Sequence, residues 1–181
     1  MERTAGPSDG AVVRAVLAGD VEQYAVLVRR YRDRYARYAF QMLGSMDGAE
    51  DAVQDALVRA FDQLAQCREP DNFAGWFFLI LRNRCFAERR RDKRFGGLDG
   101  VPEVAAPDTS EAPVERAERM QALQRALSTL TPEQREVFVL KHVEELSYQQ
   151  IAGRVGTSVA ALKMRMHRAY DRLREQLEEI R

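Results

Sequence analysis

Hydrophobic residues recur at helical spacing over most of this 181-residue chain. In segment 47–64 they fall at intervals of three and four, which places them on one face of a helix and leaves polar residues on the other. No run of alternating β-branched residues and no hairpin dipeptide interrupts the pattern, so the chain is predicted to be all-α. The predicted buried stripe of this helix comprises Ala49, Ala52, Val53, Ala56, Leu57, Ala60, Phe61 and Leu64.

Three helix starts can be identified near the C-terminus. Thr131 is followed by Pro132 and then by Gln134, which is the pattern of an N-cap with a capping box. Ser147 with Gln150 repeats this pattern, and Ser158 precedes a third helical stretch. These residues predict helices that begin after 131, 147 and 158.

The last two of these helices are spaced like a helix-turn-helix. Ala152 allows close approach of two helices, Gly156 suits the backbone angles of the turn, and Leu162 fits the core between them. A helical hairpin with a solvated basic face is the alternative, and the three caps together with this spacing favour the helix-turn-helix. The last helix is predicted to bury Leu162, Met166, Ala169, Leu173 and Leu177 and to present Ala160, Lys163, Met164, His167 and Arg168 to a major groove.

The segment 95–114 differs in composition from the rest of the chain. It holds three prolines, three glycines and four acidic residues, and it has no basic residue. Such a segment buries too little apolar surface to offset its ordering entropy, so a flexible acidic linker is predicted. The predicted organisation is therefore two small helical domains, 9–94 and 115–181, joined by this linker.

Charge is sorted along the chain although its sum is zero, with 28 basic and 28 acidic residues. Residues 47–62 carry five acidic residues and one basic residue, whereas 82–94 carry seven basic and two acidic residues. Residues 158–174 carry five basic residues and one acidic residue. Two basic surfaces and an acidic helix are typical of a protein with both polyanionic and protein partners.

Four aromatic residues, Phe73, Trp76, Phe77 and Phe78, precede the basic segment 82–94. Aromatic rings beside a basic groove can stack on unpaired bases while arginines bind phosphate. The same spacing also fits a helical core. For Trp76 and Phe77 both interpretations are open on sequence grounds.

The cysteines, the histidines and the apolar runs exclude several classes of protein. Cys67 and Cys85 are the only cysteines, they form no Cys-x-x-Cys pair, and there are two histidines, so no zinc site or disulfide framework is predicted. The N-terminus lacks the apolar core of a signal peptide, and the longest apolar run, 76–81, is too short to span a bilayer. A cytoplasmic protein that is not an enzyme is expected.

Seven segments in fixed order carry a family resemblance: LAGD (17–20), LVRRYRDR (27–34), AEDAVQDALVRAF (49–61), FAGWFFLILRN (73–83), LTPEQREVFVL (130–140), LSYQQIAGRVG (146–156) and LKMRMHRA (162–169). Together they resemble the extracytoplasmic-function (ECF) subfamily of bacterial sigma-70 family RNA polymerase sigma factors. The resemblance covers nearly the whole chain. It implies a region 2 domain at 9–94 and a region 4 domain at 115–181.

The resemblance also implies partners and site residues. The partners would be core RNA polymerase (its β′ clamp coiled coil and β flap), promoter DNA and an anti-sigma factor, with no cofactor and no small-molecule substrate. The implied core-binding residues are Asp51, Gln54, Asp55 and Arg59; the −10 DNA residues are Phe73, Trp76, Phe77, Arg82, Asn83 and Arg84, after a loop at 67–73; and the −35 DNA residues are Ser158, Lys163, Met164, Arg165, His167 and Arg168.

Two other functions are compatible with parts of the sequence. A stand-alone transcriptional regulator would use the same helix-turn-helix, but it would need a dimerisation or sensing domain where 9–94 offers a second nucleic-acid surface. A nucleic-acid enzyme would need a metal-ligand cluster, a nucleophile beside a base or a phosphate-binding glycine loop, and none is evident. For a sigma factor, overall neutrality is no obstacle, because polymerase would supply most of the affinity for DNA.

Overall fold

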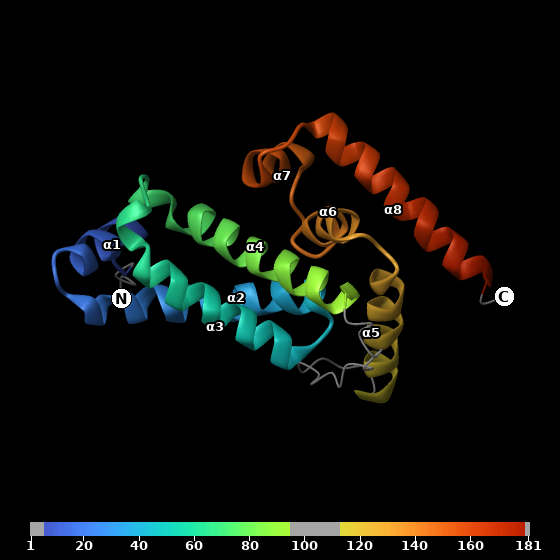
Figure 1. Cartoon of the computed structure of the whole chain (residues 1–181), viewed down its shortest axis with the longest axis horizontal. Helices are drawn as coiled ribbons and strands as arrows, with labels where there is room; N and C mark the ends of the chain where they lie inside the picture. The colour runs from blue at the N-terminus through green and yellow to red at the C-terminus, as the bar shows by residue number, and fades with distance from the viewer. Residues whose placement is uncertain (1–5, 95–112, 180–181) are drawn as a thin grey trace, which may run out of the picture.

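The computed structural model describes residues 6–94 and 113–179 (Figure 1). Within these two ranges every regular element is an α- or 3₁₀-helix, which confirms the predicted all-α class. The elements in order are α1 (Asp9–Leu17), η1 (Val21–Gln23), α2 (Tyr24–Leu43), α3 (Met46–Asp62), η2 (Leu64–Gln66), η3 (Pro70–Asn72), α4 (Phe73–Arg94), α5 (Pro113–Ser128), α6 (Pro132–His142), α7 (Tyr148–Val155) and α8 (Val159–Glu179).

The first part of the chain is a bundle in which α2, α3 and α4 run side by side (Figure 1). Tyrosines of α2 and phenylalanines of α4 fill the space between these helices: Tyr35 lies edge-on to Phe77, and Tyr38 lies edge-on to Phe78, each at 5.1 Å between ring centroids. The short helix α1 packs at one end of the bundle, against η3. The bundle therefore fixes the loop 63–72 between α1 and the start of α4.

Helix α3 largely has the predicted buried stripe. Its alanines, Val53 and Leu57 are buried, and so is Leu64 just beyond it. Two details differ from the prediction. The helix ends at Asp62, after which Leu64–Gln66 forms a 3₁₀ turn, and Phe61 is 40% exposed because its ring covers the edge of Tyr24 at the rim of the bundle.

The three predicted helix starts are confirmed. The Thr131 and Ser147 hydroxyls each accept a hydrogen bond from the backbone N–H three residues later, within complete capping boxes. The Ser158 hydroxyl accepts one from the N–H of Ala161 at 3.1 Å. Gly156 ends α7 in the left-handed region, at φ 69°, as the turn requires.

The apolar stripe of α8 is also confirmed over most of its length. Leu162, Met166 and Ala169 are buried, and Leu173 is half-buried. The side chain of Leu177 is outside the described residues. Because the stripe packs mainly on α6 and α7, the opposite face of α8 remains exposed.

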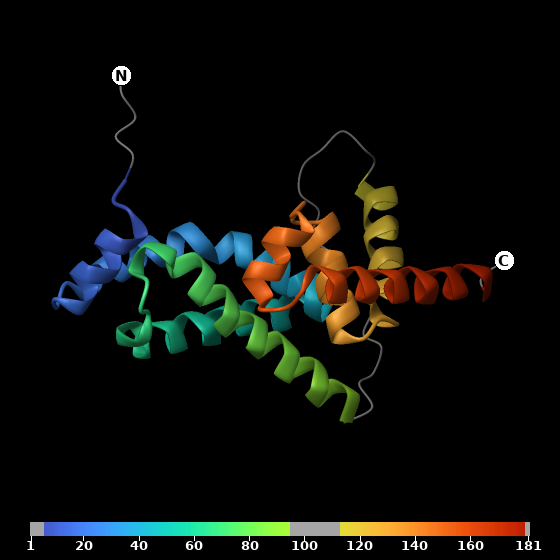
Figure 2. The same ribbon diagram turned by 90° about the horizontal axis from the view of Figure 1, so that it is seen from above.

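The C-terminal helices pack directly on the N-terminal bundle. Helix α6 contacts α2, and α7 contacts α4, whereas α8 extends away from the bundle toward the C-terminus (Figures 1 and 2). The predicted linker 95–114 is outside the described residues except for 113 and 114, which begin α5. None of the described helices is long and apolar enough to cross a membrane.

We expect Gly156→Ala to destabilise the helix-turn-helix. A left-handed backbone costs a residue with a Cβ about 1–2 kcal/mol, and no atom within 4 Å adds a steric clash. Gly153→Ala is the matched control, because Gly153 lies inside α7 with equally open surroundings, and alanine there should stabilise by about 0.5–1 kcal/mol. Urea unfolding followed by circular dichroism measures both; equal stability of the two variants would contradict the assignment of Gly156 to the turn.

Candidate polymerase and nucleic-acid interfaces

The exposed face of α8 is a candidate DNA-reading surface. Lys163, Met164, His167 and Arg168 are exposed near the start of the helix, and Met164 is 54% exposed. Their spacing of one, three and four residues places them on one side of the helix. Of the other −35 residues, Ser158 is exposed but its hydroxyl caps the helix, and Arg165 is half-buried beside this face.

The exposed face of α3 is acidic and lies on the opposite side of that helix from its buried stripe. Asp51, Gln54, Asp55 and Arg59 are all exposed. Val58, 57% exposed, lies among them. An exposed apolar side chain flanked by acidic and polar groups suits a protein partner with a basic surface.

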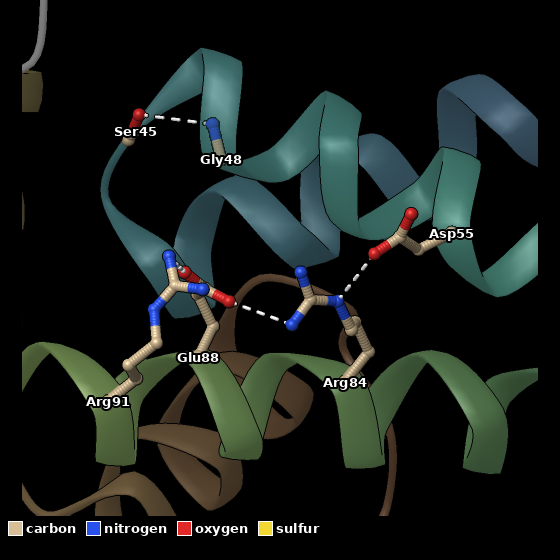
Figure 3. Close-up of polar contacts among 6 residues, drawn as sticks. All are labelled: Ser45, Gly48, Asp55, Arg84, Glu88 and Arg91. Carbon is tan, nitrogen blue, oxygen red and sulfur yellow. Dashed lines mark hydrogen bonds and ion pairs between the residues drawn. The ribbon is translucent and has the colours of Figure 1, made fainter.

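The acidic face of α3 is connected to α4 by an ion pair (Figure 3). Arg84 donates from Nε to Asp55 at 2.9 Å and from Nη1 to Glu88 at 2.8 Å. Glu88 in turn pairs with Arg91 at 2.7 Å. Arg84, predicted as a DNA residue, and Asp55, predicted as a polymerase residue, are therefore bound to each other, with Arg84 27% exposed.

Arg82 and Arg84 point to different sides of α4. Two residues are roughly 200° apart around a helix, so Arg84 faces α3 while Arg82 faces α6. There the Arg82 guanidinium donates from both Nε and Nη2 to the carboxylate of Glu136. Although burial opposes its charge, this pairing raises the pKa of Arg82 above its usual value. Asn83, between the two arginines, is exposed.

The prediction that Phe73 and Phe77 contact DNA is wrong for this arrangement of the chain. Both side chains are fully buried. Phe73 and Phe77 stack in parallel at 5.8 Å, and Phe77 also packs on Tyr35 of α2. These rings are core residues because they lie on the bundle face of α4. Trp76 lies off that face and is only half-buried.

Trp76 borders a cavity of about 570 Å³ between the loop before α4 and helix α7. Gln66, Arg68, Glu69 and Asn72 line it from the loop, which is the segment predicted to capture a base. The α7 side is lined by Gln150, Gly153 and Arg154, and the Arg154 guanidinium lies 5.4 Å from the ring centre of Phe78. A ring edge, a guanidinium and amide groups around one hollow can hold a planar polar group.

Sequence reasoning missed Arg68, Arg154 and Glu136. Arg68 lies in the predicted base-reading loop, and its positive charge there could have identified it as a DNA-binding candidate. Arg154 and Glu136 face the bundle only because the two halves of the chain pack together, and no local pattern indicated that contact.

The cysteines are packed into the bundle. Burial raises the pKa of the Cys85 thiol to about 12 and raises that of Cys67 as well. Both groups are therefore protonated at neutral pH and poorly reactive. In the described part of the chain, no group of three His, Cys, Asp or Glu side chains could hold a metal ion.

Comparison with protein families gives two matches in chain order. Residues 27–95 match the family described as Sigma-70 region 2, and residues 120–173 match Sigma-70, region 4. The first match covers most of α2 and all of α3 and α4, including the acidic face and the cavity loop. The second covers the helix-turn-helix.

Individual relatives match over most of the chain. The ECF RNA polymerase sigma factor SigE of Mycolicibacterium smegmatis is 33% identical, over 94% of this chain and 70% of the relative. The ECF RNA polymerase sigma factor SigW of Bacillus subtilis is 28% identical, over 93% and 96%.

Solved structures are also similar to this chain over most of its length. CnrH, in complex with the cytosolic domain of CnrY, is similar with a TM-score of 0.67 at 25% identity, over 96% of this chain and 99% of that one. The sigma factor RpoE of Bartonella quintana, in complex with the anti-sigma factor NepR, has a TM-score of 0.61 at 28% identity, over 90% and 99%.

We expect Phe77→Ala and Trp76→Ala to differ in their effect on stability. Removing the fully buried Phe77 ring should lower the free energy of unfolding by about 3–5 kcal/mol, whereas the half-buried Trp76 should cost clearly less because its ring is already partly hydrated. Urea unfolding of both variants, monitored by far-UV circular dichroism, makes the comparison. An equal loss would mean that Trp76 is also a core residue and is unavailable to a ligand.

Proposed function

This chain belongs to the ECF subfamily of the sigma-70 RNA polymerase sigma factors, and we propose that it binds core RNA polymerase and directs transcription from promoters with a specific −10 and −35 element. The observation that supports this most is the combination of two surfaces in one chain. An exposed helix-turn-helix face on α8 accompanies a region 2 bundle whose loop before α4 lines a cavity.

We propose that the acidic face of α3 docks on the core enzyme, at the β′ clamp coiled coil. Asp51, Gln54 and Arg59 are exposed and available to a partner. Asp55 is exposed too, but it forms an ion pair with Arg84 of α4. Asp51 is accordingly the clearest position for a test, since its replacement leaves the internal ion pair intact.

The −10 element is proposed to be read by the loop before α4 and by α4 itself. Trp76 supplies a ring at the cavity, Arg68 lies on its rim, and the exposed Asn83 lies about two turns further along the same helix. Bases that leave the duplex expose a π-face and polar edges, which suit the Trp76 ring, the Arg68 guanidinium and the Asn72 amide on the bundle side of the cavity. Phe73 and Phe77 contribute indirectly, by fixing α4 against α2.

The −35 element is proposed to be read by α8 in the major groove. Lys163 and Arg168 are donors that suit guanine edges or phosphate, and Met164 offers an apolar tip suited to a thymine methyl group. The caps at Ser147 and Ser158, together with the turn at Gly156, set the angle at which this helix is presented.

An anti-sigma factor is proposed as a further partner. Two structural relatives were solved in complexes, CnrH with the cytosolic domain of CnrY and RpoE with the anti-sigma factor NepR. The contact between the bundle and α7 in this chain leaves the outer faces of α3 and α8 exposed for such a protein. The β flap of polymerase is a further proposed contact of the C-terminal domain.

The direct test is transcription with bacterial core RNA polymerase on genomic fragments, followed by sequencing of RNA 5′ ends. The chain should produce starts that share two upstream boxes, and Asp51→Lys should reduce core binding at least about tenfold, because like charges across an interface are strongly unfavourable. Asp20→Lys, the same charge change at an exposed turn, is the control. Sequence-specific duplex binding equal with and without core enzyme would instead support a stand-alone regulator.

The proposed role of Trp76 is tested by measuring the opening of duplex promoters taken from the starts mapped in that experiment. A stacked ring contributes ~1–3 kcal/mol per base, so Trp76→Ala should weaken promoter opening about 5- to 150-fold. Trp76→Phe keeps a ring and should retain most of the activity. Unchanged opening by a folded Trp76→Ala protein would exclude stacking by this residue.

A further inference from the structure

The bundle and the C-terminal helices meet through buried charged groups. Glu136 of α6 is 2% exposed, and its carboxylate accepts two hydrogen bonds from Arg82 of α4. The Tyr38 hydroxyl of α2 lies 3.4 Å from the same carboxylate. Arg82 is itself only 20% exposed, and its guanidinium lies over the ring of Phe86. One carboxylate of the C-terminal part is thus enclosed by two helices of the N-terminal part.

The preceding residue of α6 makes a second polar contact of this kind. Arg135, 1% exposed, donates from Nε to the carbonyl of Gln41, near the C-terminus of α2. Its Nη2 donates to Gln124 of α5, which also bonds the Gln41 side chain at 2.9 Å. Burial, reinforced by repulsion from Arg89, lowers the pKa of Arg135 to about 9. The negative end of the α2 dipole and these acceptors stabilise its charge.

The charged part of this interface is suited to opening, while apolar side chains of both parts also belong to the buried core. When an apolar interface separates, its surface must be hydrated at a cost, but charged groups regain water when they separate. A buried ion pair therefore adds little net stability compared with its hydrated partners, although either partner alone is unfavourable inside the contact. The pair defines which surfaces meet without making the contact permanent.

The contact also covers the proposed −10 surface. Helix α7 forms one wall of the cavity that Trp76 borders. Arg82 donates from Nε and Nη2 to the carboxylate of Glu136. A carboxylate and a phosphate both present paired oxygens to an arginine fork. Both anions would thus bind the same atoms of Arg82.

We propose that Glu136 acts as an internal competitor of DNA, which holds the sigma factor in a closed arrangement by occupying Arg82 until promoter phosphate replaces it. The proposal rests on the proposed function for its biological meaning. The closed arrangement itself can be measured without polymerase or a promoter.

The test uses energy transfer between dyes on the full chain, attached at Ala25→Cys on α2 and Arg174→Cys on α8, both exposed positions. Cys67 and Cys85 are buried and react poorly, so the dyes go to the introduced thiols. Wild type should show a high-transfer population. Glu136→Gln and Arg82→Gln should each raise the open-to-closed ratio about 10- to 150-fold, the range for losing a hydrogen bond to a charged group. Glu50→Gln, the same change at an exposed position of α3, should leave it unchanged.

DNA binding separates competition from a merely structural role. The probe is a fluorescent 12-nucleotide single strand of randomised sequence, and the readout is anisotropy without core enzyme. Glu136→Gln should bind it more tightly than wild type, because Arg82 is released. Arg82→Gln should open equally but gain no affinity. Equal gains in both variants, or none in Glu136→Gln, would overturn the proposal.

A measurement on the wild-type chain does not depend on whether a variant folds. Saturating amounts of the same single strand should lower energy transfer in the doubly labelled wild-type chain. Unchanged transfer with DNA bound would refute competition by Glu136. Neither result depends on whether the chain supports transcription, so failure of the sigma-factor proposal would be visible separately, in the RNA 5′-end experiment.

Discussion

The arrangement of the whole molecule depends on two adjacent charged residues of α6, Arg135 and Glu136, that are buried between its two helical parts. Each is inserted into a complementary polar site of the bundle: Glu136 opposite Arg82, and Arg135 at the Gln41 carbonyl near the C-terminus of α2. Buried charges are tolerated only with such partners. This requirement fixes the orientation of α6 on α2, and through α6 the positions of α7 and α8.

The same contact explains how a chain of zero net charge can contain strongly charged surfaces. The acidic face of α3 and the basic face of α8 lie on different helices and remain exposed. Part of the basic character of α4 is neutralised by acidic residues of other helices, Glu136 on one side and Asp55 on the other. The positive charge available to DNA in this arrangement is therefore smaller than the composition of 82–94 indicates.

Relatives of this chain were solved in complexes, CnrH with the cytosolic domain of CnrY and RpoE with the anti-sigma factor NepR. In this chain the two helical parts contact each other directly. A closed arrangement maintained by polar contacts and an arrangement stabilised by a separate protein have a common physical consequence. In the proposed closed arrangement the occupied group is Arg82, and a separate protein would likewise occupy the groups that it contacts. They differ in reversibility, because an internal carboxylate competes at a fixed effective concentration, and a partner competes at its own.

Local features of this protein follow from its sequence alone. The helices, their caps at Thr131, Ser147 and Ser158, and the turn at Gly156 were predictable because each depends on a few neighbouring residues. The family followed from seven ordered segments for the same reason. The exposed faces of α3 and α8 were predictable from helical periodicity, which determines a face without reference to the rest of the molecule.

Only the tertiary structure decided what each side chain contacts. Periodicity could not distinguish Phe77, which packs on Tyr35, from Trp76, which borders a cavity, since both lie in one aromatic cluster. It also could not show that Arg82 and Arg84 have separate carboxylate partners, one of them 54 residues away. Burial and pairing depend on surfaces brought together from distant parts of the chain. Such contacts leave no periodic trace in the sequence of either part.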